Sequence, residues 1–270
     1  MQSRPITLGL VADGPSAEDA FVDLAAAVLR AGGPVLEPKF FASYPGLLEG
    51  CTHGGCDAAW APPLVAHELR HTDVRSPVAI VVREAGAFYY AALVVAADRV
   101  GRSPSLPDLA GRRIGWVSPR SAAGYVVPRL QLQALGYDPD RLFGKQSFHF
   151  THGRLLEALA RGEIDAAATY AHAQPNGELR TAHVHSARIV MAAGPIPGDV
   201  VVARASVAAA LSRALERADV LERGPLARHT GVRHFLPAPE CHFRAIARWS
   251  DLASSLGMPG APPTLMSDSR

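Results

Sequence analysis

Short apolar runs alternate with amphipathic segments along most of the chain. This alternation predicts strands followed by helices, and therefore an α/β fold with largely parallel sheets. The expected strands are 6–11, 35–41, 57–61, 78–83, 89–97, 114–117, 147–150, 164–170, 188–193 and 200–203. The expected helices are 16–29, 44–51, 64–70, 106–109, 124–135, 154–161, 207–217 (capped by Ser206) and 245–256.

Part of this pattern occurs twice. Residues 43–61 and 151–169 align without a gap at an offset of 108. Each copy contains a polar pair, a helix, a Gly that ends the helix and an Asp that opens an apolar strand. Such self-similarity predicts two similar lobes, each with its own sheet. The identical positions are Leu47/Leu155, Leu48/Leu156, Glu49/Glu157, Gly54/Gly162, Asp57/Asp165, Ala58/Ala166 and Ala59/Ala167.

The order of the elements suggests how the lobes are connected. We expect lobe I to hold residues 1–95, lobe II to hold 96–198, and 199–270 to return to lobe I and end in C-terminal helices. The β-rich segments 89–97 and 199–204 would then form a hinge of two segments. The Pro/Ser-rich residues after the last helix are expected to be loosely held.

Charge and hydropathy exclude several kinds of partner. A formal net charge of +2 and the absence of a Lys/Arg tract argue against nucleic acid. The longest apolar run, 88–97, is about half as long as a membrane span, so membrane insertion is not expected. Acidic residues near the start leave no apolar core for a secretory signal. The chain as given is therefore expected to be cytoplasmic, or periplasmic if it is a trimmed mature form.

The reactive residue types do not form a known catalytic or metal-binding motif. The three cysteines do not make a disulfide framework. Cys51, His53 and Cys56 lack the second half of a zinc site, so no metal is expected. The chain contains no G-x-S-x-G, Walker or H-E-x-x-H motif. We therefore expect no catalytic residue and no cofactor.

The segment 111–125 is the strongest candidate for a ligand site. An apolar strand there breaks into a Ser/Pro turn that leads into a helix. A helix start presents backbone N–H groups and the positive end of the helix dipole, and this arrangement binds anions. The alternative is that Ser121 is a plain N-cap. The expected contacts come from Ser118, Ser121 and the N–H groups of Ala122, Ala123, Gly124 and Tyr125.

Arg120 lies in the same turn. Its guanidinium could grip phosphate or carboxylate with two hydrogen bonds, or it could be a solvated turn residue.

The internal repeat adds further candidates. Ser43-Tyr44 and Thr151-His152 occupy equivalent positions, at helix starts that follow strands. Ligands of open α/β sheets lie outside the carboxyl ends of strands, so both pairs are expected to face one cleft from opposite lobes. His152 could donate to an anionic ligand or act only as a cap-like residue. Tyr44 and Trp60 would supply aromatic walls, although Trp60 fits a core position equally well.

Several segments resemble type 2 periplasmic binding proteins. Residues 105–114 resemble the S-L-x-D-L-x-G-K-x-V segment that opens the second lobe of that superfamily. Residues 119–128 resemble the P-x-S-x-S-G-Y-x-x-P segment of the phosphate/phosphonate (phosphite) transporter-binding branch, and 150–152, 162–166 and 195–202 also fit it. The resemblance covers most of the chain. It implies a two-lobed α/β fold with two mixed sheets, a two-segment hinge and ligand capture by closure.

The resemblance also bears on individual residues. Asp199 lies where the family has an acid near the hinge, which implies contact with a cationic ligand group. The alternative is a turn-forming Asp after Gly198. Ala122 and Ala123 replace residues that carry hydroxyls in the family pattern. Each hydrogen bond to a charged group that is lost in this way is worth about 1.5–3 kcal/mol.

These observations favour a solute-binding protein that captures a small phosphonate- or phosphate-like oxyanion by hinge closure. Its partners would be the small anionic ligand and an ABC permease or a signalling protein. One alternative is a cytosolic enzyme that reuses the fold, of the menaquinone- or thiamine-pathway type, although no acid/base pair or nucleophile is evident. The other is a ligand-sensing domain that acts on a partner.

Overall fold

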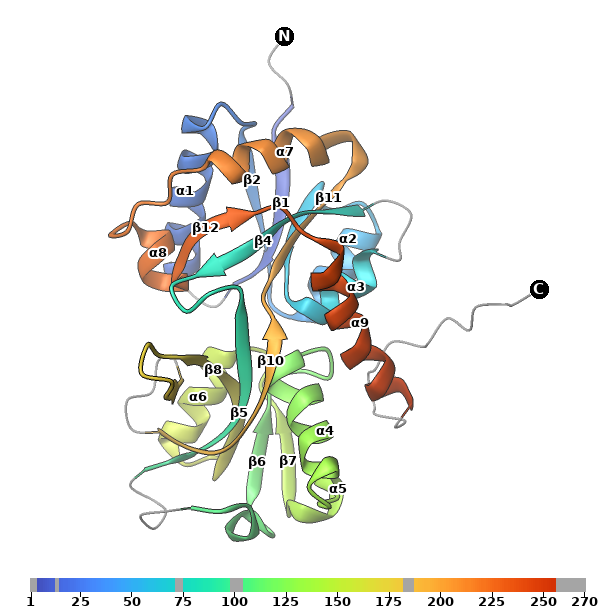
Figure 1. The fold of residues 1–270 in the computed structure, drawn as a ribbon, viewed down its shortest axis with the longest axis vertical. Coiled ribbons are helices and arrows are strands. Elements are labelled where there is room, and N and C mark those ends of the chain that lie inside the picture. The colour runs from blue at the N-terminus through green and yellow to red at the C-terminus, as the bar shows by residue number, and fades with distance from the viewer. Residues whose placement is uncertain (1–3, 13–14, 71–74, 98–103, 182–186, 256–270) are drawn as a thin grey trace, which may run out of the picture. The chain divides into compact units, whose positions relative to one another are not determined.

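The computed structural model describes residues 4–12, 15–70, 75–97, 104–181 and 187–255 (Figure 1). The chain divides into two compact units. The sequence predicted two changes of lobe, at 95/96 and 198/199. In the structure the chain changes between the units five times, at 89/90, 171/172, 180/181, 194/195 and 242/243. Unit 1 consists of Met1–Tyr89, His172–Arg180 and Pro195–His242, and unit 2 of Tyr90–Ala171, Thr181–Gly194 and Phe243–Arg270.

Unit 1 is built on a mixed six-stranded sheet. Its strands are β1 (Ile6–Val11), β2 (Leu36–Phe41), β3 (Ala58–Ala61), β4 (Arg75–Arg83), β11 (Val200–Arg204) and β12 (Val232–Leu236). They lie in the order β12-β4-β11-β3-β1-β2, with β1 parallel to β2 and β3, and β11 antiparallel to β3 and β4.

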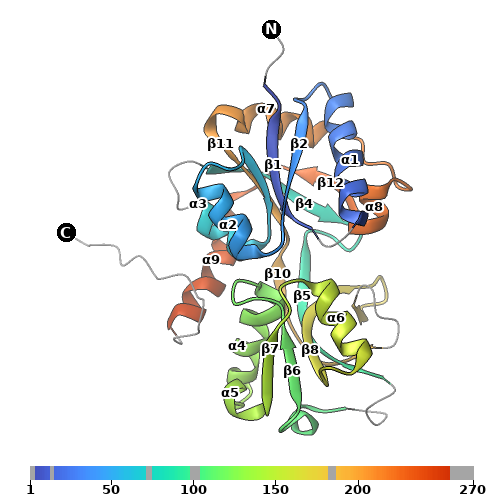
Figure 2. The same ribbon diagram turned by 180° about the vertical axis from the view of Figure 1, so that it is seen from behind.

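Helices cover both faces of this sheet (Figures 1 and 2). One face carries α1 (Pro15–Arg30), α7 (Ala205–Arg217) and α8 (Pro225–Thr230), and the other carries α2 (Tyr44–Thr52) and α3 (Pro63–Arg70). The core between the sheet and the first group is aliphatic with two phenylalanines, Phe21 and Phe235.

The second sheet has the order β10-β5-β8-β6-β7, with β9 paired to β8. Its strands are β5 (Phe88–Ala96), β6 (Arg113–Trp116), β7 (Lys145–Phe148), β8 (Ala166–Ala173), β9 (Leu179–Arg180) and β10 (Ala187–Pro197). The helices α4 (Val127–Ala134) and α6 (His152–Arg161) lie on opposite faces of it (Figures 1 and 2). The remaining elements are η1 (Leu106–Leu109), η2 (Ala122–Val126), α5 (Pro139–Leu142) and α9 (Glu240–Ser255).

The two units contain the same core motif. In unit 1 the chain runs β1-α1-β2-α2-β3. In unit 2 it runs β6-α4-β7-α6-β8, with the short η2 before α4 and the short α5 after it. The first strand of each motif lies between the other two and is parallel to both. Equivalent glycines pair with equivalent alanines, Gly9 with Ala59 and Gly115 with Ala167. The repeat expected from 43–61 and 151–169 is therefore confirmed as a structural repeat.

The repeated aspartates join the strands of each motif. The Asp57 carboxylate accepts the backbone N–H of Thr7 at 3.0 Å, and the Asp165 carboxylate accepts that of Arg113 at 3.0 Å. In return, the N–H groups of Asp57 and Asp165 donate to the carbonyls of Thr7 and Arg113. Each aspartate thus fixes the start of the third strand against the first, which explains why both copies of the repeat open this strand with Asp.

Low pH should weaken the contacts of the Asp165 carboxylate. The Arg113 guanidinium donates to Asp165 at 2.7 Å and lowers the pKa of that carboxyl to about 2. Since the folded pKa lies below the unfolded value, the stabilisation is complete above about pH 4 and is lost as the pH falls towards 2. Asp165→Asn should lower the free energy of unfolding at pH 6 by on the order of 1–2 kcal/mol, with little effect at pH 2. Urea unfolding across this range measures the difference, with the exposed Asp251→Asn as control; an equal loss at both pH values would contradict it.

The repeated glycines allow helix side chains to reach the sheet. A Cβ on Gly115 would lie 2.4 Å from Leu155 Cδ1 and 2.5 Å from Ile164 Cδ1. Overpacking of this kind typically costs about 1–3 kcal/mol, so Gly115→Ala should lower the urea midpoint. Gly46→Ala is the matched control, because its Cβ would meet nothing closer than Ser43 Oγ at 3.4 Å. Equal midpoints for the two variants would contradict the packing argument.

Some expected elements differ from the structure. The helix expected at 124–135 begins as the π-helix η2 and continues as α4. Pro128 has no N–H to offer the Gly124 carbonyl, which instead accepts the N–H of Val117 at 3.0 Å. The strand expected to end at 193 continues to Pro197; β10 is an edge strand, where a missing proline N–H is tolerated. α7 is capped at Arg204 and not at Ser206.

Four short elements were not expected from the sequence. α5, α8, β9 and β12 have four, six, two and five residues, too few for a hydrophobic period to be visible. The final helix begins at Glu240, five residues earlier than expected. Residue 256, its expected end, and the Pro/Ser-rich residues after it lie outside the described residues.

Candidate functional site

Two loops meet at the carboxyl ends of β6 and β7 in unit 2. The ladder continues beyond both strands, because His149 N–H donates to the Trp116 carbonyl at 2.9 Å and Phe150 N–H to the Val117 carbonyl at 2.8 Å. These bonds bring the segments that contain Ser118 and Thr151 next to each other. Phe150 has φ = 68°, a left-handed conformation that residues other than glycine rarely adopt. Backbone strain of this kind is concentrated at functional sites.

The serines of the first loop form hydrogen bonds with their own turn. Ser121 Oγ accepts the Gly124 N–H at 3.0 Å, and Ser118 Oγ accepts the Arg120 N–H at 3.3 Å. Both side chains are buried. A hydroxyl that accepts a backbone N–H still carries its own O–H, which can donate to an anion oxygen. Ser121 is therefore an N-cap, as the alternative interpretation held, and this role leaves its proton available.

The helix start supplies backbone donors beside these hydroxyls. Ala122 and Ala123 are the first residues of η2, and the first N–H groups of a helix have no acceptor within it. Gly124 allows this turn to lie directly on the end of β6: a Cβ there would be 2.4 Å from Val117 Cγ2. The ring of Tyr125 packs between Trp116 and Phe148, so only the backbone of this residue can face a ligand in the turn. Burial raises the pKa of its phenol.

His152 is held by the neighbouring strand. Its Nδ1 lies 2.9 Å from Thr169 Oγ1, and its ring meets the Tyr170 ring edge-on with the centroids 4.8 Å apart. Thr151 caps α6 by accepting the Arg154 N–H at 3.2 Å. Sequence reasoning missed Thr169. Its signal was a hydroxyl directly after the three alanines of an expected strand, at the last position of the repeat.

A second cluster lies in unit 1 around Asp199. The Asp199 carboxylate accepts Arg83 Nη2 at 2.6 Å and Trp60 Nε1 at 3.1 Å. Arg83 Nε also donates to the Thr230 carbonyl at 3.0 Å. The Trp60 ring packs edge-on against Phe235. Sequence reasoning missed Arg83, although a charged residue at the end of an apolar strand was the available signal.

Tyr89 of unit 1 lies close enough to this carboxylate to interact with its charge. Burial raises the pKa of Tyr89 well above its usual value, and the nearby charges of Asp199 and Tyr44 raise it further. The Tyr89 phenol is therefore protonated at neutral pH and can donate a hydrogen bond. Ser43 caps α2 by accepting the Gly46 N–H at 3.2 Å, which places Tyr44 in the first turn of that helix. Asp199 thus contacts Trp60 directly, whereas Tyr44 and Asp199 each interact electrostatically with Tyr89.

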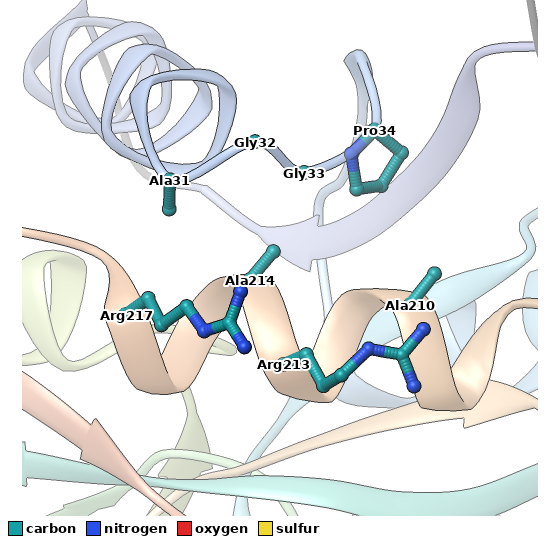
Figure 3. A pocket seen from close by; sticks show the side chains of 8 residues that line it. All are labelled: Ala31, Gly32, Gly33, Pro34, Ala210, Arg213, Ala214 and Arg217. Carbon is teal, nitrogen blue, oxygen red and sulfur yellow. The ribbon is translucent and has the colours of Figure 1, made fainter.

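A hollow of about 260 Å³ lies elsewhere on unit 1, between the end of α1 and α7. Figure 3 shows Arg213 and Arg217 of α7 beside the turn 31–34. None of the site residues expected from the sequence lines this hollow. In the part of the chain that the structure describes, no group of three or more His, Cys, Asp or Glu side chains is arranged to hold a metal. No described helix has the length and apolarity of a membrane span.

Three solved structures share this fold. A binding protein component of an ABC phosphonate transporter from Pseudomonas aeruginosa has a TM-score of 0.74 and 18% identity, over 92% of this chain and 86% of that one. PhnD1 from Prochlorococcus marinus in complex with methylphosphonate has a TM-score of 0.73 and 15% identity, over 93% and 98%. The alkanesulfonate-binding protein SsuA from Xanthomonas axonopodis pv. citri, bound to MOPS, has a TM-score of 0.65 and 18% identity, over 97% and 96%.

Identities this low show the fold alone. They confirm the two-lobed α/β architecture with two mixed sheets that the resemblance to type 2 periplasmic binding proteins implied. No curated protein sequence matches the chain.

The family comparison tests the expected function. The sequence model that matches residues 11–220 describes an ABC transporter, phosphonate, periplasmic substrate-binding protein. This family is periplasmic and serves transport, which does not support the cytoplasmic location, the cytosolic enzyme or the signalling partner considered from the sequence. Because this match spans well over half of the chain, the protein belongs to the family of periplasmic substrate-binding proteins of phosphonate ABC transporters.

Proposed function

We propose that the protein captures a small phosphonate- or phosphate-like anion between lobes that close about the segments 89–97 and 199–204, and delivers it to an ABC permease. The observation that carries this proposal is the turn between β6 and η2. Two buried serine hydroxyls and the first N–H groups of a helix lie together there. Such a combination suits a tetrahedral oxyanion, which offers several acceptor oxygens to converging donors.

The oxyanion end of the ligand would be held by unit 2. Ser118 and Ser121 would donate their O–H groups, and Ala122 and Ala123 their backbone N–H groups. The Arg120 guanidinium would add a charge-assisted contact. Thr151 and His152 would approach from the start of α6, with Thr169 fixing the orientation of the His152 ring.

The organic end of the ligand would lie against residues of unit 1, namely Ser43, Tyr44, Trp60 and Asp199. Arg83 already balances the charge of Asp199 through a 2.6 Å contact. The cationic ligand group that the resemblance implied for Asp199 would therefore have to displace an existing ion pair. A ligand with a short uncharged tail, such as methylphosphonate, fits this arrangement better than an aminoalkylphosphonate.

Titration calorimetry of the whole protein tests the proposed function. We expect saturable binding of methylphosphonate with one site per chain, with weaker binding of acetate, which has fewer acceptor oxygens. Phosphate, phosphite and an alkanesulfonate are the informative competitors. X-ray scattering should show a smaller radius of gyration when the site is saturated. Absence of heat with every tetrahedral anion, or chemical consumption of the ligand, would overturn the proposal.

A further inference from the structure

The turn between α2 and β3 brings two cysteines together in the core of unit 1. Cys51 lies in the last turn of α2, and Cys56 lies two residues before the first residue of β3. The chain reverses between them, with Gly54 at φ = 77° and the Gly55 N–H donating to the Gly50 carbonyl at 2.7 Å. The two side chains are 1% and 2% exposed, so the pair is sealed from solvent.

The sulfur atoms are closer than packing alone would place them. Cys51 Sγ and Cys56 Sγ are 2.7 Å apart. Carbon atoms in contact pack at about 3.5–4.0 Å, and sulfur is the larger atom. A disulfide places its two sulfurs at about 2.05 Å. The observed separation lies between these values, so a small movement of either side chain completes the bond.

The structural repeat shows what this position holds without cysteines. At the offset of 108, Cys51 and Cys56 correspond to Leu159 and Ile164 in unit 2, which are likewise buried. Cys56 and Ile164 also pack against equivalent glycines, Gly9 and Gly115. Unit 2 therefore fills the space with two branched side chains, whereas unit 1 fills it with two small thiols in direct contact.

His53 lies between the cysteines in sequence, and its ring contacts the end of helix α2. Its Nδ1 lies 2.9 Å from the Glu49 carbonyl of its own helix, and the contact is exposed. The spacing that suggested a metal motif thus belongs to a helix end followed by a thiol pair.

We propose that Cys51 and Cys56 form a disulfide in the mature protein. The family is periplasmic, and the bacterial periplasm is an oxidising compartment. The reaction exchanges the two thiols with the disulfide of an oxidant such as oxidised glutathione. The Cys51–Cys56 S–S bond forms, the S–S bond of the oxidant breaks, and the two cysteine protons leave with two molecules of reduced glutathione. Since the pair is buried, the bond forms during folding, before unit 1 closes around it.

Thiol counting tests this inference independently of any ligand. The protein is refolded in a glutathione redox buffer, denatured without reductant and alkylated. We expect one modified cysteine, the exposed Cys241, and a mass lower by two hydrogen atoms than that of the reduced chain. Reduction before alkylation should raise the count to three. The tryptic peptide 40–70 contains both cysteines, and before alkylation it should be lighter by two hydrogen atoms in the unreduced sample than in the reduced sample.

The control is a variant in which both cysteines are replaced by the residues found at the equivalent positions of unit 2. Cys51→Leu with Cys56→Ile should keep the packing, and its thermal midpoint should not respond to reductant. The midpoint of the wild type should fall by several degrees when the protein is unfolded with reductant. Three alkylated cysteines in the oxidised wild type, or a glutathione adduct at either position, would overturn the inference.

Discussion

Ser121→Asp is expected to abolish the binding of phosphonates and phosphate. Aspartate is as good an N-cap as serine, so the Gly124 N–H keeps its acceptor and the helix start should remain. The new carboxylate, however, would lie where the ligand oxygens are proposed to bind. Like charges this close cost several kcal/mol, and each 1.4 kcal/mol is tenfold in affinity, so we expect a loss of at least about 100-fold. Calorimetry with methylphosphonate measures it.

Ser121→Asn is the matched control for that experiment. Asparagine also caps helices and is close to aspartate in size, but it carries no charge. It should bind the anion more weakly than the wild type and much better than the aspartate variant. Thermal unfolding of all three proteins checks that the fold is intact. If the Asn and Asp variants lost the same affinity, charge repulsion would not be the cause, and the oxyanion would not lie beside Ser121.

Arg83→Gln should change which ligands the protein prefers. This substitution removes the guanidinium that balances Asp199 and leaves the carboxylate with Trp60 as its hydrogen-bond donor. An ammonium group of the ligand could then take the place of the guanidinium. A hydrogen bond between charged groups is worth about 1.5–3 kcal/mol, so the affinity ratio of 2-aminoethylphosphonate to methylphosphonate should rise about tenfold or more. Competition calorimetry with the two ligands measures this ratio.

The double variant Arg83→Gln with Asp199→Asn completes the comparison. Without the carboxylate, the gain for the amino ligand should disappear, while the oxyanion contacts of unit 2 remain. Breaking the ion pair will also lower stability, and the double variant separates this loss from the change in preference. An unchanged ligand ratio in the single variant would mean that Asp199 does not face the ligand, even if methylphosphonate still binds.

Most of the fold could be predicted from the sequence because it rests on local patterns. The repeat of helix, Gly, Asp and strand predicted both lobes, since each of its residues has a local physical role: Gly54 and Gly162 adopt the positive φ that ends a helix. The π-turn of η2 was beyond such reasoning. It depends on Pro128 leaving the Gly124 carbonyl to Val117, a contact between segments that no hydrophobic period reveals.

The candidate site, like the fold, could be predicted only in part. The turn at Ser118 and Ser121 could be recognised because a strand end, a hydroxyl and a helix start are adjacent in sequence. The pairing of His152 with Thr169, and of Asp199 with Arg83, could not be predicted. Thr169 and Arg83 come from strands that only the sheet topology brings near their partners. Arg83 and Asp199 are 116 positions apart, and nothing local couples them. Because Arg83 balances the charge of Asp199, the ligand is now expected to have an uncharged tail in place of a cationic one.

The strand order of unit 1 has a consequence for biosynthesis. β11 lies between β4 and β3, so the sheet of unit 1 is interrupted until residues 200–204 have been made. The central strands of unit 2, β5 to β8, are complete well before that point. Domains usually fold in the order in which the ribosome releases them, N-terminal first. Here the inserted unit has its strands available first, and the half-sheet that precedes it must stay unaggregated until its missing central strand emerges.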